Sequence, residues 1–383
     1  MFAFSHLDRV LFVAPHPDDE SLGGGGLLQR AFAAQIPVRV LFATNGDNNP
    51  WAQRFWERRW KIGSQERVRW GERRQREALA SVISLGGPAE SARFLNFQDQ
   101  SITSLLMQAD PELFDALADE IRAFDPTILV IPTILDAHPD HSALGVALSF
   151  VLDLIGNPGI QVWEYLVHRP HVSVLRLPVM LRLSPIEIEG KRNAILCHET
   201  QVALSRRRFL QYAEPEEGFY PHAATGAASD VRPILKAYVR EDGLNLLLSA
   251  RGRERLGTEV LLAFRSKGIQ MHRWRVKVPI FSGVAQISDV VGGKRLHDAV
   301  ATWDSSSLSL SVPIPKALSI DALFMKLSSW TLFFDRSGWC RIPVPSGRSL
   351  IKNPQSSESI DPLVIACLLD RRIAQTRKQK CSH

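Results

Sequence analysis

Two short segments concentrate the side chains that most often bind metals and move protons. Residues 15–20 read Pro-His-Pro-Asp-Asp-Glu and place one imidazole and three carboxylates within five residues. Residues 136–141 read Asp-Ala-His-Pro-Asp-His, with two histidines three positions apart beside two aspartates. Histidine and carboxylate suit zinc, and a catalytic zinc keeps three protein ligands and one open position. Together the segments predict a metal-dependent catalytic site.

Each segment directly follows a run of apolar residues that is typical of a buried strand. Residues 9–14 precede the first segment, and residues 127–131 precede the second. Ligands of open α/β sheets gather outside the carboxyl ends of the strands. An Asp-rich surface turn would explain the first segment alone. Two such clusters on the same rim of one sheet favour a shared site.

The first two hundred residues alternate between strand-like and helix-like patterns. Residues 38–44 and 160–167 are further apolar runs, and residues 64–85, 111–124 and 141–154 favour helices. Apolar strands separated by helices imply crossover connections and a mostly parallel sheet that is covered on both faces. The predicted fold class is α/β, with a Rossmann-like, mostly parallel sheet flanked by helices.

The pattern changes in the C-terminal part of the chain. Residues 307–314 alternate between polar and apolar side chains, and turn sequences such as residues 335–338 separate runs of this kind. Several short strands with regular turn signals predict a smaller, all-β, sandwich-like domain. We therefore predict an α/β domain over residues 1–229, a β-rich accessory domain over residues 230–350, and a basic, flexible tail over residues 351–383.

The aromatic residues of the β-rich region have two interpretations. Such side chains fill the core of a small sandwich, or they form a platform that stacks on sugars. The residues concerned are Trp303, Trp330, Phe333, Phe334 and Trp339. We expect them to be core residues.

Residues 23–26 are four consecutive glycines that resemble a phosphate-binding loop at first sight. The run lacks the GxGxxG spacing and the lysine of the phosphate-binding motifs. We therefore expect close backbone packing, where the chain passes from the first segment into a helix, and no nucleotide.

The composition excludes several classes of protein. A hydrophobic content of 45% and a charged content of 22% are ordinary for a soluble globular chain. No apolar run reaches the roughly 18 to 20 residues of a membrane-spanning helix, and residues 1–11 lack the features of a signal peptide. The four cysteines form no CxxC pair, which indicates a reducing compartment. We expect a cytoplasmic protein, and its oligomeric state is not predicted.

Residues 51–70 have the most unusual local composition, because aromatic residues interleave with arginines and lysine. No nucleic-acid-reading module accompanies this basic cluster, so no nucleic-acid partner is expected. One interpretation is a solvated helix whose aromatic side packs on the core. The other is a lid in which aromatic rings stack on a sugar while Arg58 and Arg59 pair with an anionic group. Peripheral contact with a membrane surface is a further alternative.

The two chemical segments resemble the signature of the PIG-L/LmbE-like deacetylases, zinc hydrolases that remove acetyl groups from N-acetylglucosaminyl conjugates. The resemblance covers about residues 8–210 and does not extend to the β-rich remainder. Supporting matches lie at residues 44–47, at Arg74 and Glu77, and at residues 94–99 and 164–168.

The resemblance implies roles for the residues of both segments. It assigns His16, Asp19 and His141 as zinc ligands, Asp18 as the general base and His138 as the electrostatic or acid partner. Zinc lowers the pKa of a bound water to about 7 and polarises a carbonyl, and a positioned general base contributes typically about 10²- to 10⁴-fold. His138 would face the developing oxyanion when protonated.

The other aspartates of the second segment have two interpretations. Asp140 and Asp136 are candidates to orient the histidines from behind, as carboxylates commonly do at metal sites. Either could instead cap the following helix, and we favour the capping interpretation for Asp136. Asp140 is therefore the predicted orienting residue.

Three residues outside the segments are predicted to bind substrate. The resemblance implies this role for Arg74, for Asp99 as an acceptor from sugar hydroxyl groups, and for Asn45. A structural alternative exists for Arg74, because Glu77 lies three positions further along the same predicted helix and could form an ion pair with it.

We therefore expect a zinc-dependent hydrolase that removes the N-acetyl group of an N-acetylglucosaminyl conjugate, with one divalent cation as cofactor. The expected partner is a small-molecule amino-sugar conjugate, with an anionic or lipid-linked aglycone as an open alternative. The same site could cleave another sugar-linked amide, or the chain could be a non-catalytic carbohydrate-binding protein. An unligated Asp18 beside three ligands argues against a pure binder.

Overall fold

The computed structural model describes most of the chain. The described residues are 4–169, 178–222, 234–240, 243–249, 258–266, 270–315, 318, 320–329, 338–342 and 344. The chain up to Val344 forms one compact unit. The boundaries expected at residues 229 and 350 remain predictions, and the predicted tail lies outside the described residues.

Within the described residues, the first sheet has seven strands, and five of these form a parallel set. The order across the sheet is β3-β2-β1-β4-β5-β7-β6. The parallel strands are β1 (Val10–Ala14), β2 (Val38–Thr44), β3 (Ala92–Phe97), β4 (Ile128–Pro132) and β5 (Gln161–Tyr165). Antiparallel pairing adds β7 (Glu216–Pro221) and β6 (Val179–Arg182). The prediction of a mostly parallel α/β sheet is confirmed.

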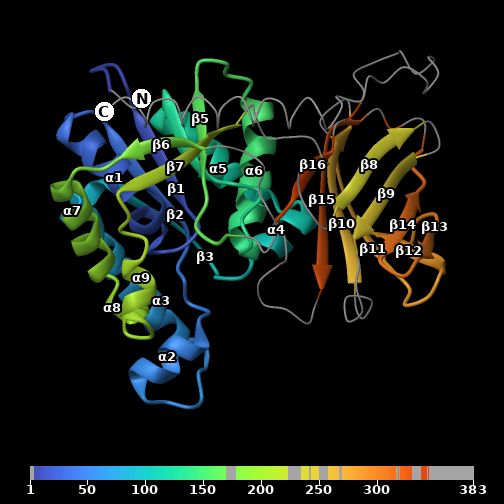
Figure 1. The fold of residues 1–383 in the computed structure, drawn as a ribbon, viewed down its shortest axis with the longest axis horizontal. Helices are drawn as coiled ribbons and strands as arrows, with labels where there is room; N and C mark the ends of the chain where they lie inside the picture. The colour runs from blue at the N-terminus through green and yellow to red at the C-terminus, as the bar shows by residue number, and fades with distance from the viewer. Residues whose placement is uncertain are drawn as a thin grey trace, which may run out of the picture. The chain divides into compact units, whose positions relative to one another are not determined.

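Helices cover both faces of this sheet, because successive side chains of a buried strand point to opposite sides (Figure 1). Val10 and Phe12 of β1 pack in one core cluster with α1 (Asp19–Ala33), α3 (Ser64–Ser84) and α7 (Pro185–Leu196). Leu11 and Val13 pack in a second cluster with α4 (Ile102–Gln108), α5 (Pro111–Phe124) and α6 (Pro139–Ile155). The other α-helices of the described residues are α2 (Pro50–Glu57), α8 (Glu199–Val202) and α9 (Arg206–Leu210).

The strand order reverses between β1 and β4. From β1 the chain proceeds to β2 and β3 on one side, whereas β4 and β5 lie on the other side. β1 and β4 pair directly and in parallel, with Phe12 opposite Val130, so their carboxyl ends meet at the same edge. Such a reversal is where open α/β sheets leave a crevice for ligands. The two chemical segments leave β1 and β4 at this crevice.

The glycine run lies inside α1, where the helix packs tightly against the sheet. A Cβ atom added to Gly23 would lie 2.3 Å from the ring of Tyr165, and one added to Gly24 would lie 2.3 Å from the ring of Phe12. Side chains cannot approach so closely, and Gly24 also interrupts the helical backbone geometry. The expectation of close backbone packing is confirmed.

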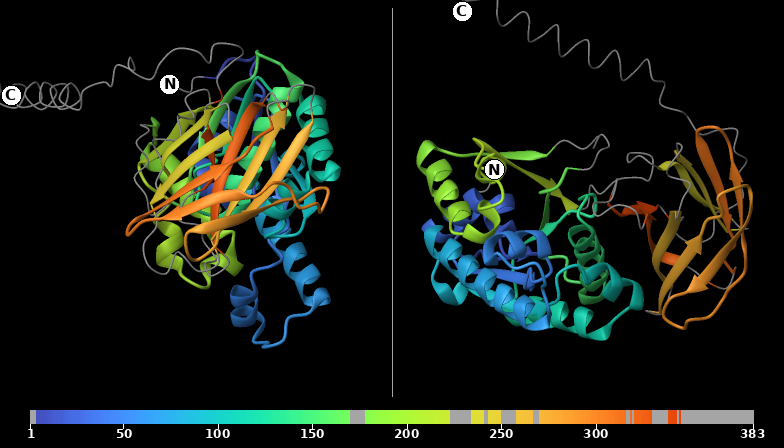
Figure 2. Two further views of the ribbon diagram at one scale, coloured as in Figure 1. Left: turned by 90° about the vertical axis from the view of Figure 1, so that its right-hand side faces the viewer. Right: turned by 90° about the horizontal axis from the view of Figure 1, so that it is seen from below.

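The C-terminal domain is an antiparallel sheet of nine described strands, in the order β16-β15-β10-β11-β12-β13-β14-β9-β8. Residues from β9 and β14 share one apolar core with residues from β10 and β11, so the sheet folds over on itself (Figure 2). The predicted all-β C-terminal domain is confirmed. The strands are β8 (Ile234–Arg240), β9 (Gly243–Ser249), β10 (Thr258–Ser266), β11 (Met271–Lys277), β12 (Gly283–Asp289), β13 (Ala299–Trp303), β14 (Ser307–Val312), β15 (Ile320–Ser329) and β16 (Cys340–Ile342).

Two of the five aromatic residues expected in the core of this domain fall within the described residues. Trp339 is fully buried, and Trp303 is partly buried with its indole N–H donated to the carbonyl of Pro279. Trp303 packs against the core of the β-rich domain, as expected. Trp339 instead packs in the core of the first domain, so the expected sandwich-core position is wrong for this residue. Trp330, Phe333 and Phe334 lie outside the described residues.

Among the described helices, none is both long enough and apolar enough to cross a bilayer.

Candidate metal centre and its cavity

Three ligand atoms from the two segments form a compact triangle. Nδ1 of His16 lies 3.2 Å from Nε2 of His141 and 3.2 Å from Oδ2 of Asp19. Oδ2 of Asp19 lies 3.1 Å from Nε2 of His141, which closes the triangle. All three side chains are buried. The structure thus brings together the three residues predicted as metal ligands, although 125 positions separate the two histidines.

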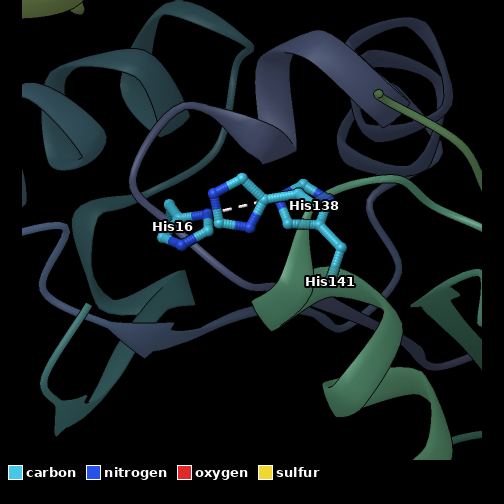
Figure 3. Close-up of side chains that lie close together, drawn as sticks. All are labelled: His16, His138 and His141. Carbon is cyan, nitrogen blue, oxygen red and sulfur yellow. Dashed lines mark hydrogen bonds between the residues drawn. The ribbon is translucent and has the colours of Figure 1, made fainter. Parts of the chain in front are cut away.

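His138 lies beside this triangle. Figure 3 shows its imidazole next to those of His16 and His141, with ring centroids 4.7 Å from His16 and 4.9 Å from His141. Candidate ligand atoms of the three histidines all lie within 4.8 Å of one another, as do those of a second set, His16, Asp99 and Asp140. In the triangle with Asp19, all three separations are 3.1 to 3.2 Å.

Carboxylates hold the outer nitrogens of both histidines in the triangle. Nε2 of His16 lies 3.1 Å from Oδ1 of Asp99 and 3.3 Å from Oδ2 of Asp140. Nδ1 of His141 lies 3.2 Å from Oδ2 of Asp136. Such pairs fix the tautomer and the orientation of a metal-binding imidazole. Nδ1 of His16 and Nε2 of His141 are therefore the nitrogens that would face a metal ion.

Asp136 does not cap the following helix, contrary to our expectation. His138 occupies the N-cap position of α6, and its Nδ1 accepts a hydrogen bond of 3.3 Å from the backbone N–H of Asp140. Asp136 instead accepts from the backbone N–H groups of His138, Val167 and His168 at 2.8 to 3.0 Å. These contacts hold the carboxylate that faces His141, because the segment after the neighbouring strand β5 supplies two of the three donors.

Asp140 is held in the same way by the segment before α4. Its Oδ2 accepts from the backbone N–H of Gln100 at 2.7 Å, and its Oδ1 accepts from that of Ile102 at 3.2 Å. The carboxylate is fully buried. The predicted orienting residue therefore links the helix that carries His141 to the imidazole of His16.

Asp18 adopts a strained backbone conformation at the start of α1. Its φ is 141°, a region that residues with a side chain rarely adopt and that is often found at functional sites. Glu20 supports this conformation by accepting from the backbone N–H of Asp18 at 3.0 Å. The other oxygen of Glu20 accepts from Ser81 and His198 at 2.5 and 2.7 Å. Glu20 thus supports the loop and does not join the triangle.

Arg74 forms its ion pair with Asp18. Its Nη2 lies 3.2 Å from Oδ2 of Asp18, and its two terminal nitrogens also donate to the carbonyls of Pro17 and Gly46. The ion pair expected with Glu77 is not formed, because the carboxylate of Glu77 accepts from the backbone and side chain of Thr200 at 3.0 and 2.6 Å. Arg74 therefore pairs with another element, whereas Glu77 contacts Thr200 and also lies 3.5 Å from Arg73 of its own helix.

Burial and the neighbouring charges shift the acid strengths in the site. Burial raises the pKa of Asp18 to about 6, because desolvation of the carboxylate outweighs the opposing effect of Arg74. Burial lowers the pKa of His141, but Asp19 and Asp136 outweigh it and raise the pKa to about 10. The pKa of Asp19 is held well below its usual value, because His141 and His16 outweigh its burial. The carboxylates of Asp19 and Asp136 thus stabilise positive charge at the triangle.

His138 is neutral in this surrounding. Burial lowers its pKa well below the usual value, and the imidazoles of His16 and His141 lower it further. Because Nδ1 accepts the capping hydrogen bond, the proton of the neutral ring resides on Nε2. This differs from our expectation of a protonated His138, and it leaves the ring able to donate a hydrogen bond without a charge.

A cavity of about 650 Å³ opens onto the site. Six of the predicted site residues line it: His16, Asp18, Asp19, Arg74, Asp99 and His138. Asn45 does not, because its side chain bonds Gln75 at 2.6 Å, and Asn48 and Asn49 of the same loop line the cavity instead. The remainder of the wall is Leu22, Pro50, Trp51, Gln100, His168, Gln201, Leu204, Ser205, Arg208, Phe209 and Tyr212.

The sequence analysis did not predict that the segment around α8 and α9 forms part of the cavity wall. Arg208, Phe209 and Tyr212 come from this segment, and their types show no metal-binding or catalytic pattern. The run of three arginines at residues 206–208 is the signal that could have pointed to it. His168 is a second cavity residue that the sequence analysis did not single out. It lies in the segment after β5, and its backbone N–H donates to Asp136.

Residues 51–70 divide between the core and the surface. Trp70 is buried within α3, whereas Trp51, Phe55 and Trp60 are 68%, 63% and 79% exposed. The core interpretation therefore fails for these three residues. Trp51 lines the cavity, but Arg58 and Arg59 line a separate surface depression of about 400 Å³.

Comparison with known proteins gives a family match that includes both chemical segments. Residues 11–151 match the sequence model of the PIG-L family, described as GlcNAc-PI de-N-acetylase. The chain is 30% identical over 169 residues to the 1D-myo-inositol 2-acetamido-2-deoxy-alpha-D-glucopyranoside deacetylase of Rhodococcus jostii, and 26% identical over 190 residues to that of Tsukamurella paurometabola. These matches cover 39% and 43% of this chain and only 54% and 62% of the relatives.

Similar solved structures each match somewhat more than half of the chain. N,N'-diacetylchitobiose deacetylase from Pyrococcus horikoshii is 22% identical with a TM-score of 0.43, over 56% of this chain and 83% of that chain. A conserved protein of Thermus thermophilus is also 22% identical with a TM-score of 0.43, over 56% of this chain and 95% of that chain. The family match spans both chemical segments, and the chain thus contains a PIG-L family domain over residues 11–151.

Proposed function

We propose that the protein is a zinc-dependent hydrolase that removes the N-acetyl group from an N-acetylglucosaminyl conjugate. The observation that carries this proposal is the triangle of His16, Asp19 and His141, which lies in a cavity beside the unligated carboxylate of Asp18. The family match and the two deacetylase relatives support the reaction class. Because those relatives are matched over about half of their length, the substrate is part of the proposal.

The donor atoms of the triangle fit zinc. Ligands with bonds of about 2.0 to 2.2 Å at tetrahedral angles lie about 3.3 to 3.5 Å from each other. The three observed separations are 3.1 to 3.2 Å, and two imidazole nitrogens with one carboxylate oxygen form a common zinc ligand set. His16, Asp19 and His141 would therefore hold the ion. Bound there, zinc would lower the pKa of a water to about 7 and polarise the amide carbonyl.

We assign the role of general base to Asp18. Its pKa of about 6 leaves it ionised at neutral pH and able to take the proton of the attacking water. Arg74 fixes the carboxylate from one side, so that the strained backbone of Asp18 points it into the cavity. The same carboxyl group can then return the proton to the leaving amine.

His138 is suited to stabilise the oxyanion. Its capping hydrogen bond directs the Nε2–H group away from the helix, and the residue lines the cavity. A preorganised donor in a buried site lowers the energy of the transition state more than that of the substrate. The neutral ring therefore serves as a hydrogen-bond donor, and an imidazolium is not required.

The cavity suits a sugar conjugate. Its volume of about 650 Å³ is in the range typical of small-molecule sites, and its wall combines amides and aromatic rings. Both terminal nitrogens of Arg74 are engaged by the protein, so we now assign Arg74 to positioning Asp18. Asn48, Gln201 and Arg208 are the polar side chains that we propose contact the sugar or its aglycone.

An anionic or lipid-linked aglycone is the finer part of the substrate proposal. Arg208 provides a cation inside the cavity wall, and Trp51 connects the cavity to the exposed aromatic and basic surface of α2. Aromatic and cationic side chains of this kind suit contact with a membrane surface. Arg208→Ala should then raise KM for a phosphorylated N-acetylglucosaminide more than for a neutral one. Equal effects on both substrates would remove this part of the proposal.

The deciding experiment measures acetate release from a panel of N-acetylglucosaminyl conjugates. We expect release by the purified protein, its loss after chelation, and its recovery when zinc is added back. Cleavage of sugar-linked amides other than acetyl, without acetate release, would favour the second enzymatic alternative. Sugar binding without any hydrolysis would favour a carbohydrate-binding protein. Cytoplasmic location remains a prediction that cell fractionation checks.

A further inference from the structure

The β-rich domain packs directly against the helices that carry the candidate metal centre. Side chains of β10 and β15 alternate between two cores: Leu261 and Phe324 belong to the core of the first domain, whereas Leu262 and Met325 belong to the core of the β domain. The ring of Phe324 packs edge-to-face against Phe150 of α6, with centroids 5.1 Å apart. One face of this sheet therefore packs into the core of the first domain.

The chain just before β16 contacts the loop that carries Asp136. The backbone N–H of Trp339 donates to the carbonyl of Ile134 at 2.6 Å, and the Trp339 side chain is fully buried in the core of the first domain. A Cβ atom added to Gly338 would lie 2.0 Å from the carbonyl oxygen of Ile134 and 2.7 Å from that of Asp136. The backbones approach so closely here that only glycine fits.

A second contact reaches the helix whose leading segment holds Asp140. Arg273 of β11 is fully buried, and its Nε donates to the carbonyl of Leu106 in α4 at 2.7 Å. Its guanidinium lies over the ring of Phe150, 4.7 Å from the centroid. The opposite end of α4 supplies the N–H of Ile102 to Asp140. The β domain therefore touches both segments that support the orienting carboxylates.

We propose that the β-rich domain is a clamp that positions Asp136 and Asp140, and through them the imidazoles of His141 and His16. This role rests on the proposed metal site, and Gly338, Trp339 and Arg273 are positioning residues in it. The clamp explains why the domain is packed into the first core and not attached by a surface linker. It also predicts that substitutions which disturb the contact between the two domains weaken zinc binding.

A matched pair of glycine substitutions tests the clamp. Gly338→Ala forces the Ile134–Asp136 backbone to move, whereas Gly283→Ala in β12 of the same domain has no atom within 4 Å of the added Cβ. We expect Gly338→Ala to weaken zinc affinity by about tenfold or more, the loss typical when a supporting contact of a metal ligand is disturbed. Gly283→Ala should bind zinc like the wild type. Chelator competition measures both affinities.

Amide hydrogen exchange in the metal-free protein provides a readout that needs neither zinc nor activity. We expect faster exchange in the peptide covering residues 131–138 for Gly338→Ala, and no change for Gly283→Ala. Arg273→Met, which keeps the aliphatic stem, should accelerate exchange across residues 99–106. Leu310→Ala, in the core on the other side of the sheet, should lower the melting temperature without changing zinc affinity. That control separates positioning from general destabilisation.

The outcomes distinguish the clamp from the proposed function. If Gly338→Ala and Gly283→Ala show equal zinc affinity and equal exchange, the clamp is wrong even when the wild type is an active zinc enzyme. If the wild type binds no zinc, the proposed function fails, and the exchange comparison still decides whether the domain holds the Asp136 loop.

Discussion

The guanidinium of Arg74 lies 3.2 Å from the carboxylate of Asp18, and both side chains are buried. This pair joins the middle of α3 to the strained residue at the start of α1. It holds the proposed base in place and also sets its acidity, because the cation lowers the pKa that burial raises. The proposed mechanism can therefore be tested at Arg74 without changing any proposed ligand.

Arg74→Met should lower kcat by up to about 10²-fold, the cost typical of a slightly misplaced catalytic group. Loss of the cation also raises the pKa of Asp18 above its value of about 6. Since the base must be ionised, the acidic limb of the kcat/KM profile should move to higher pH, and the deficit should be larger at pH 6 than at pH 8. Arg73→Met is the matched control, because Arg73 stacks on Trp56 and is partly exposed. Identical profiles for the two variants would contradict the pairing role.

Asp18→Asn should retain zinc and lose activity by about 10²- to 10⁴-fold, because the amide cannot accept the proton of the attacking water. His16→Ala should lose both, since it removes one corner of the triangle. Elemental analysis of the purified variants, together with acetate release, checks both statements. An Asp18→Asn variant with wild-type turnover would exclude Asp18 as the base.

Asp99→Asn separates two possible roles of Asp99. Its Oδ1 lies 3.1 Å from Nε2 of His16, so we expect it to orient this imidazole. The substitution should then weaken zinc affinity by about tenfold or more. A contact to sugar hydroxyl groups alone would raise KM and leave zinc affinity unchanged. Parallel measurement of zinc affinity and KM decides between the roles.

Gly46→Ala should destabilise the protein and impair catalysis together. Gly46 has φ of 60°, and an added Cβ would lie 1.9 Å from Nη1 of Arg74. Gly156→Ala is the control, because Gly156 has φ of 63° but no atom within 4 Å of an added Cβ. The control should cost about 1 to 2 kcal/mol of unfolding free energy from the backbone conformation alone. Denaturant unfolding and acetate release should show a greater stability loss, and a catalytic defect, only in Gly46→Ala.

Much of the site could be predicted from local patterns. His16, Asp19 and His141 belong to the two segments that follow apolar runs, and neighbouring parallel strands end at the same edge of a sheet. Adjacency at that edge follows from strand order, which requires only that the two strands pair. The ligand triangle therefore needed few long-range contacts beyond the pairing of β1 with β4.

Partner choice among buried charges could not be predicted in this way. Glu77 lies three positions after Arg74 on the same helix, but its carboxylate accepts from Thr200, while Arg74 pairs with Asp18. A spacing rule considers only one helix, whereas the partner of a buried group depends on which element packs against that face. The same reason explains Asp136, because the two backbone donors to its Oδ2 come from the segment after β5, which local sequence patterns do not place beside it.

The sequence by itself determined the chemistry of the two segments, the α/β pattern that places them at strand ends, and the change to an antiparallel β domain. Only the tertiary structure decided which carboxylate supports which imidazole, which segments wall the cavity, and that Gly338 and Trp339 contact the Asp136 loop. The physical reason is one of range. Periodicity and residue type act over a few neighbouring positions, whereas hydrogen-bond partners and contacts between domains depend on how distant elements pack.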